Sequence, residues 1–165
     1  MKLTHFIKKL SDLVDRVTGK VVVVLIIAMI ITITLQILTR IFAQALTWTE
    51  ELSRYLLVWS TFLGATLAYK RGLHISVTFV RDLFPKVVQK GIVVLGVLVS
   101  LIFFFLAVWN GFNLISLQIF QVSPAMQVPM RWIYLGIPLG FFIMIIHALS
   151  LGLEELGSSR EGANP

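Results

Sequence analysis

Long apolar segments bounded by charged residues dominate this sequence. The first runs from Val21 to Leu38, between Lys20 and Arg40, and three more follow it. A helix needs roughly 20 apolar residues to cross the hydrocarbon core of a bilayer, which is about 30 Å thick. Hydrophobic residues make up 58% of the chain and charged residues only 13%, which excludes an ordinary soluble domain. We therefore expect an all-α integral membrane protein.

The apolar pattern predicts one membrane domain, 1–165, built from four transmembrane helices and an N-terminal amphipathic interfacial helix. The expected ranges are 2–17 for the surface helix, 21–44, 50–69, 91–117 and 132–153 for spans one to four, 73–84 for an interfacial element, and 154–165 for a polar tail. Apolar residues in 2–17 recur at helical spacing, with charged residues on the other face. A helix packed beneath a partner's loop is the alternative for this segment.

Basic residues predict the orientation of the chain. They concentrate in the N-terminal segment and in the loop between spans two and three. Two basic segments separated by an even number of spans lie on one side of the membrane, and the positive-inside rule makes that side cytoplasmic. We therefore expect both termini in the cytoplasm, and we assign the net charge of +6 to topology rather than to nucleic-acid binding.

Polar and charged residues gather where spans one and two meet. One face of span one carries a polar residue at every fourth position: Thr32, Gln36, Arg40 and Gln44. Charge against lipid is costly, so this face is expected to contact protein. Arg40 can pair with Glu50 or Glu51 across the connection, and Arg54 can pair with either acid along its own helix. Either these charges neutralise one another within the chain, or one acid is kept for a partner subunit.

Small residues recur at four-residue spacing on two spans. They are Ser60, Gly64 and Ala68 on span two, and Gly136 and Gly140 on span four. Small side chains let membrane helices approach closely. We expect both rows to lie at helix contacts, either within this chain or with a partner.

The sequence does not indicate catalysis or a cofactor. It contains no cysteine, which excludes disulfides, thiol nucleophiles and cysteine-based metal sites. His147 is the one histidine inside an expected span, whereas haem in a helical bundle needs two facing axial ligands. No acid lies in the middle of a span, where a transporter would carry ions or protons. We predict no enzymatic activity and no catalytic, substrate-binding, metal or cofactor site.

The block from Trp48 to His74 resembles a known family. Its residues Trp48-Thr-Glu-Glu-Leu-Ser-Arg-Tyr-Leu-Leu-Val-Trp59, Leu63-Gly-Ala65 and Ala68-Tyr-Lys-Arg-Gly-Leu-His74 are similar to the small membrane subunit (Q-type, DctQ-like) of tripartite ATP-independent periplasmic (TRAP) transporters. The later segments Ser123-Pro-Ala-Met-Gln-Val-Pro129 and Ile137-Pro-Leu-Gly140 are similar to the final loop and fourth span of that family. The resemblance covers residues 18–155.

This resemblance implies a scaffold subunit in the bacterial inner membrane. It implies a large membrane subunit that carries the sodium and substrate sites, and a periplasmic binding protein that delivers an organic anion of the dicarboxylate or sialic acid type. Membrane lipids are the other expected partners. The residues expected to meet the partner subunit are Arg40, Trp48, Glu50, Glu51, Arg54 and His74. The candidates for periplasmic docking are Gln44, Gln121, Gln127 and Arg131.

Two other functions compete with this interpretation. The chain could be a stand-alone four-helix transporter acting as a homo-oligomer, although such proteins generally need an embedded ionisable residue for coupling. It could also be a membrane redox protein, against which the absent cysteines and the unpaired His147 argue.

Overall fold

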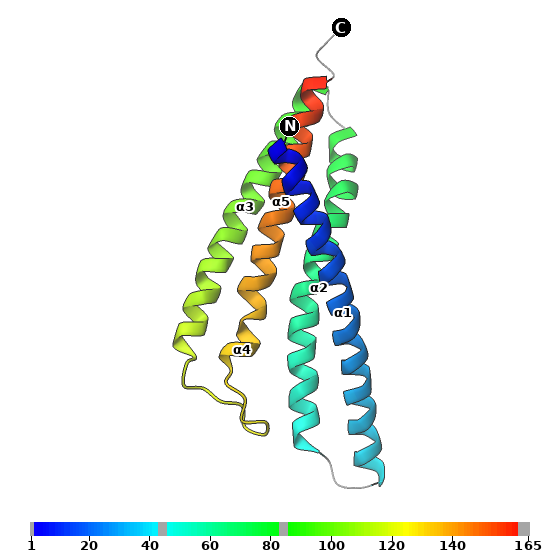
Figure 1. Cartoon of the computed structure of the whole chain (residues 1–165), viewed down its shortest axis with the longest axis vertical. Coiled ribbons are helices and arrows are strands. Elements are labelled where there is room, and N and C mark those ends of the chain that lie inside the picture. The colour runs from blue at the N-terminus through cyan, green and yellow to red at the C-terminus, as the bar shows by residue number, and fades with distance from the viewer. Residues whose placement is uncertain (1, 43–45, 83–85, 162–165) are drawn as a thin grey trace.

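The computed structural model describes residues 2–42, 46–82 and 86–161. The elements within these ranges are α1 (Lys2–Phe42), α2 (Thr47–Asp82), α3 (Lys86–Leu117), α4 (Arg131–Tyr134) and α5 (Gly136–Glu161). The four long helices run along the long axis of the molecule (Figure 1). The start of α1 and the end of α5 lie at one end, which we call the termini end; the segment between α3 and α4 lies toward the opposite end, the loop end (Figure 1).

Two helices continue past the boundaries that we expected from the sequence. α1 has 41 residues, so the predicted surface helix 2–17 and span one form a single helix. α2 has 36 residues and continues through Lys70, Arg71 and Gly72, where we expected a break before the interfacial element. Neither helix contains proline, so charged residues change the polarity of its surface without interrupting its backbone hydrogen bonds. At about 1.5 Å per residue, α1 is about 60 Å long, roughly twice the hydrocarbon thickness.

Three segments of the described chain are long and apolar enough to cross a membrane. They are Thr4–Phe42, Val94–Leu117 and Arg131–Glu154. The expected second span lies in α2, which is less apolar because charged residues occur at both ends of that span and serine and threonine lie within it. The all-helical class is confirmed, and three of the four expected spans have counterparts among these segments.

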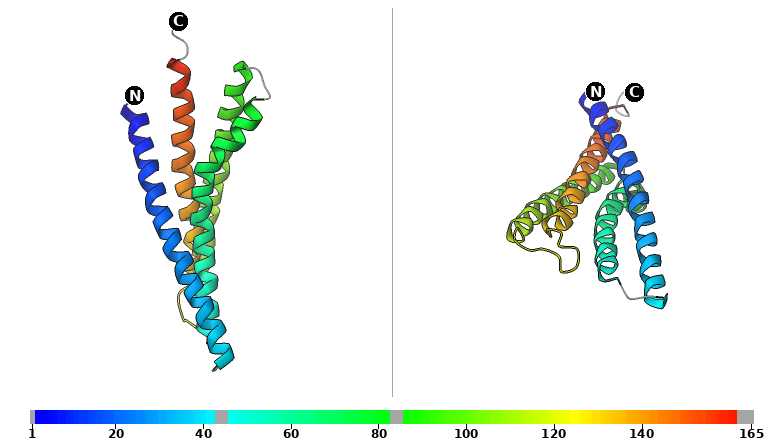
Figure 2. Two further views of the ribbon diagram at one scale, coloured as in Figure 1. Left: turned by 90° about the vertical axis from the view of Figure 1, so that its right-hand side faces the viewer. Right: turned by 60° about the horizontal axis from the view of Figure 1, so that its bottom comes forward.

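The helices pack as two pairs joined through α5. α1 lies along α2, and α3 lies along α5, while α5 also contacts α2 and α1 (Figure 2). Phe104, Met144 and Ala148 form the buried centre between α3 and α5, and Tyr69 of α2 packs against it. The rings of Tyr69 and Phe104 meet edge to face, with centroids 4.9 Å apart.

Large apolar surfaces on α1 and α3 have no partner within the chain. On α1 the exposed residues include Val23, Val24, Ile26, Ile27, Ile30 and Ile31. On α3 they include Leu95, Leu98, Val99, Ile102, Phe105, Leu106 and Trp109. A soluble monomer rarely exposes a contiguous apolar patch of this extent. These surfaces are therefore suited to lipid or to another membrane subunit.

Glycines bring α5 close to α2. A Cβ atom on Gly140 would lie 3.1 Å from the Cβ atom of Phe62, and one on Gly136 would lie 3.4 Å from the ring of Trp59. Gly64 differs, because a Cβ atom there would meet nothing within 4 Å, and Ala68 is exposed. The structure thus places the glycines of span four at a helix contact, while Gly64 of span two faces open space and Ala68 is exposed within the described residues.

These glycines give a matched test of the α2–α5 contact. Gly140→Ala forces the new methyl group against Phe62, and overpacking of this kind costs about 1–3 kcal/mol. We expect a lower unfolding temperature in detergent for Gly140→Ala, measured by scanning fluorimetry. Gly64→Ala is the control and should not lower it, since its methyl group enters open space. Equal unfolding temperatures for the two variants would contradict this close contact.

Candidate functional site

Glu51 attaches the segment between α3 and α4 to the beginning of α2. Its Oε2 atom accepts hydrogen bonds from the backbone N–H groups of Met126, at 2.7 Å, and Ala125, at 3.2 Å. The residue is only 3% exposed. Hydrogen bonds to a carboxylate are stronger than those between neutral groups. The charge of Glu51 is therefore stabilised by this chain's own backbone.

The attached segment is ordered by its own hydrogen bonds. Ser123 donates its backbone N–H to the carbonyl of Val128 at 2.9 Å, and its hydroxyl accepts the N–H of Val128 at 3.2 Å. Met130 donates its N–H to the carbonyl of Gln121 at 2.9 Å. Gln127 closes the turn with a φ of 55°, in the left-handed region that non-glycine residues seldom adopt. The loop therefore presents a defined surface.

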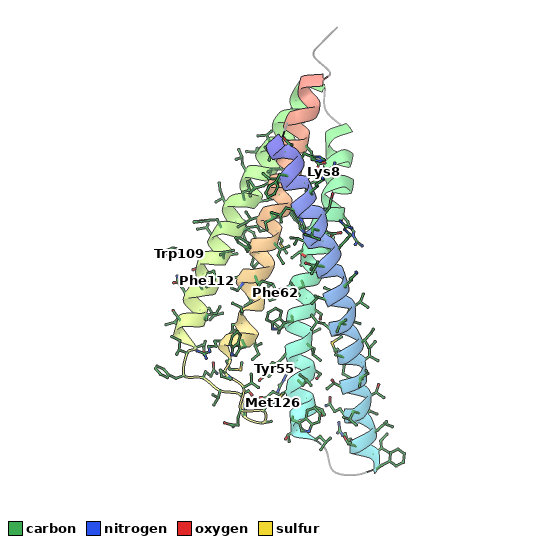
Figure 3. The ribbon with its side chains drawn as sticks, viewed as in Figure 1. Lys8, Tyr55, Phe62, Trp109, Phe112 and Met126 are labelled. Carbon is green, nitrogen blue, oxygen red and sulfur yellow. The ribbon has the colours of Figure 1, made fainter. Side chains whose placement is uncertain are left out.

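Tyr55 makes a second contact between α2 and this loop. It lies one helical turn beyond Glu51, on the same face of the helix. Its hydroxyl points to the sulfur of Met130 at 3.6 Å. Figure 3 shows Tyr55 and Met126 where the loop meets α2. We call Glu51, Tyr55 and the loop residues that they contact the loop-end cluster.

Glu50 faces a different direction from its neighbour. Its carboxylate lies 3.9 Å from the guanidinium of Arg54, and the two side chains are 62% and 65% exposed. An exposed pair of this kind contributes little to stability. Glu51 therefore serves the fold, whereas Glu50 and Arg54 present charge on the surface.

Arg40 does not complete the charged cluster that we expected. It is exposed, and among the described residues neither Glu50 nor Glu51 forms an ion pair with it. The reason is that Glu51 accepts loop N–H groups, while Glu50 pairs along its own helix. On the same face of α1, Thr32 is buried and donates its hydroxyl to the carbonyl of Ala28 at 2.7 Å.

The other predicted interface residues lie near the loop end or outside the described regions. Trp48 is 39% exposed, and Gln121, Gln127 and Arg131 are exposed. The guanidinium of Arg131 lies 5.7 Å from the centroid of the Trp132 ring, within the range of a cation–π contact. Gln44 lies outside the described residues, and His74 lies in the part of α2 whose side chains are not described.

A second polar cluster joins three helices and was not predicted. Its members are Ser11, Asp12 and Asp15 of α1, Lys70 and Arg71 of α2, and His147 of α5. We call it the termini-end cluster. The Nζ atom of Lys70 lies 2.7 Å from the Oδ1 atom of Asp12. The hydroxyl of Ser11 lies 2.8 Å from the Nδ1 atom of His147, which is completely buried.

The termini-end cluster changes the interpretation of residues 2–17. Part of the charged face that we expected in water is turned toward α2, so this stretch of α1 packs against other helices. The alternative that we stated from the sequence placed this helix beneath a partner's loop, whereas the neighbours seen here are α2 and α5 of the same chain. One sequence signal could have indicated it: His147, Ser150 and Glu154 share one face of the last span. Among the residues that the structure describes, no three metal-binding side chains converge.

Comparison with protein families identifies the chain. The family described as tripartite ATP-independent periplasmic transporters, DctQ component, matches residues 29–156, which is more than half of the sequence. The chain belongs to the DctQ family. It is therefore a DctQ-like small membrane subunit of the TRAP type, and the family is a transporter component.

Individual relatives of this DctQ chain have different names. It is 32% identical over 135 residues to the isethionate TRAP transporter permease protein DctMQ of Oleidesulfovibrio alaskensis, covering 74% of this chain and 21% of that protein. It is 30% identical over 117 residues to the ectoine TRAP transporter small permease protein TeaB of Halomonas elongata, covering 70% and 61%. It is 24% identical over 144 residues to the sialic acid TRAP transporter small permease protein SiaQ of Vibrio cholerae, covering 87% and 83%. The chain thus spans less than two thirds of the first two relatives.

The loop-end cluster can be tested at its carboxylate. Glu51→Ala leaves two backbone N–H groups without their acceptor, and a hydrogen bond to a charged group contributes about 1.5–3 kcal/mol. We expect faster hydrogen exchange at the amides of Ala125 and Met126, measured by mass spectrometry on peptides that cover the loop. Glu50→Ala is the matched control, since Glu50 accepts no loop N–H in this structure. Equal exchange in the two variants would contradict the attachment.

The termini-end cluster can be tested at Ser11. Ser11→Ala leaves the buried Nδ1 atom of His147 without its partner, at a cost of about 1–3 kcal/mol. We expect a lower unfolding temperature in detergent than for Ser116→Ala, which removes an exposed hydroxyl. The same unfolding temperature for both variants would show that the Ser11–His147 contact does not hold α1 against α5.

Proposed function

We propose that this chain is the scaffold subunit of a sodium-driven, binding-protein-dependent transporter for organic anions. In this proposal a large membrane subunit carries the substrate across the membrane. The small subunit enlarges the static scaffold against which the transport domain of the large subunit moves. The match to the DctQ family over residues 29–156 carries this proposal. It fits a chain whose described ion pairs lie toward the two ends of the bundle.

The surface of the bundle supports a partner in the membrane. The exposed apolar residues of α1 and α3 form long stripes that could meet lipid or a second membrane protein. The exposed pair of Glu50 and Arg54 lies at the loop end of α2, where it can form ion pairs across an interface. We propose that Glu50 contacts the partner subunit, since Glu51 is already hydrogen-bonded within the chain.

The proposed topology has four spans and both termini in the cytoplasm of a bacterium. α2 supplies the second span, which is less apolar than the three other segments. The basic residues at the termini end support a cytoplasmic location of that end. The loop end then faces the periplasm, where Gln44, Gln121, Gln127 and Arg131 are our candidates for contact with the binding protein.

We propose that other subunits choose the solute. The relatives are named for isethionate, ectoine and sialic acid, yet all are similar to this one chain. Similar small subunits thus occur in transporters named for very different solutes. A subunit of this type is poorly suited to select the solute. An organic anion of the dicarboxylate or sialic acid type is the substrate class that we propose here.

Reconstitution tests this function directly. Liposomes that contain both membrane subunits, supplied with the binding protein and an inward sodium gradient, should accumulate the anion. Omitting the small subunit should abolish uptake, and replacing sodium with potassium should do the same. Full uptake by the large subunit alone would overturn the scaffold role. Uptake by liposomes holding only this chain would instead support the stand-alone homo-oligomer.

The exposed charges of α2 provide the residue-level test. Glu50→Gln and Arg54→Ala should lower co-purification of the large subunit and lower uptake, because each removes a charge available to the partner. Lys9→Ala is the control, since it removes an exposed charge at the opposite end of the bundle. The two α2 variants behaving like Lys9→Ala in the same uptake assay would remove these residues from the interface.

A further inference from the structure

A groove opens between α1 and α2 on the termini side of the bundle. It has a volume of about 480 Å³, and its lining includes Asp15, Arg16, Lys20 and Arg71 as well as Val23 and Val24. Arg16 and Lys20 lie one helical turn apart on α1, and the two valines follow on the next turn. The groove therefore changes from cationic to apolar along the helix, in the direction of the long exposed apolar stretch of α1.

The polar part of this groove has an excess of positive charge. Three of its side chains are cations and one is an acid, and Asp15 lies 3.9 Å from Arg71. The side chain of Arg71 is nevertheless 71% exposed, so its guanidinium can bind an anion in addition to Asp15. Among the residues that the structure describes, Arg16 and Lys20 form no ion pair, and both are exposed. The groove thus offers three cations to a ligand.

The position of these cations matches the edge of the bilayer. Lys20 directly precedes Val21, and from there the exposed apolar residues of α1 continue without an intervening charged residue as far as Arg40. Long basic side chains at such a boundary extend their charged ends toward the headgroups. Anionic phospholipids attract basic residues placed at this depth. A free phosphate ion would use the cations but would leave the adjoining valines without a role.

We propose that this groove binds an anionic phospholipid, with its phosphate against Arg16, Lys20 and Arg71 and an acyl chain along Val23 and Val24. A guanidinium group suits a phosphate because it donates two parallel hydrogen bonds. The lipid would connect α1 to α2 beside the termini-end cluster. This inference does not depend on which solute the transporter carries.

Native mass spectrometry of the purified full-length chain tests the proposal, with phosphatidylglycerol and phosphatidylcholine added in defined amounts. We expect retention of phosphatidylglycerol in preference to phosphatidylcholine. The double variant Arg16→Gln/Lys20→Gln should weaken phosphatidylglycerol binding by roughly fivefold for each cation removed. Arg40→Gln/Arg54→Gln is the matched control, since it removes two exposed cations near the other end of the bundle.

Three results with the isolated chain would overturn the proposal. They are equal retention of the two lipids by the wild-type chain, equal phosphatidylglycerol binding by the two double variants, and displacement of the lipid by millimolar inorganic phosphate. Displacement of the lipid on assembly with the large subunit would also overturn it, because the groove would then belong to a protein contact. Should the double variant fail to fold, Lys20→Gln alone must still lose roughly fivefold.

Discussion

Polar groups placed against hydrocarbon must find partners within the protein, and this requirement organises both ends of the bundle. At the loop end, the carboxylate of Glu51 is bonded to two backbone N–H groups. At the termini end, Lys70 pairs with Asp12, and Ser11 pairs with the buried His147. Between these ends, apolar surfaces are exposed. The two clusters therefore hold the helices in register, while apolar packing holds them side by side.

Much of the fold could be predicted because hydrocarbon thickness leaves few alternatives. Apolar length indicated the helical class and three segments long and apolar enough to cross a membrane. The spacing of Gly136 and Gly140 indicated a close helix contact, and α2 provides it through Trp59 and Phe62. The block beginning at Trp48 indicated the family, which the match over residues 29–156 bears out. These features depend on local sequence, so no knowledge of tertiary arrangement was needed.

The remaining features depend on how distant segments meet. The partner of Glu51 is a backbone segment 74 residues away, and no side-chain pattern marks a backbone N–H as a donor. His147 likewise meets a distant residue, since its partner Ser11 lies 136 residues away. The continuous α1 and α2 were missed for another reason: charges and a glycine alter the hydrophobic pattern, whereas only the backbone decides whether a helix continues.

The two adjacent acids of α2 have a consequence for how this subunit tolerates change. A helix turns by about 100° per residue, so the inward direction of Glu51 and the outward direction of Glu50 depend on angular phase. Because the rest of α2 is held by its packing against α5, deleting one residue just after the two acids would turn Glu50 toward the loop in place of Glu51. Inserting a whole turn at the same point would nearly restore the direction of both side chains. At the beginning of α2, the orientation of the residues about the helix axis therefore matters more than the length of the segment.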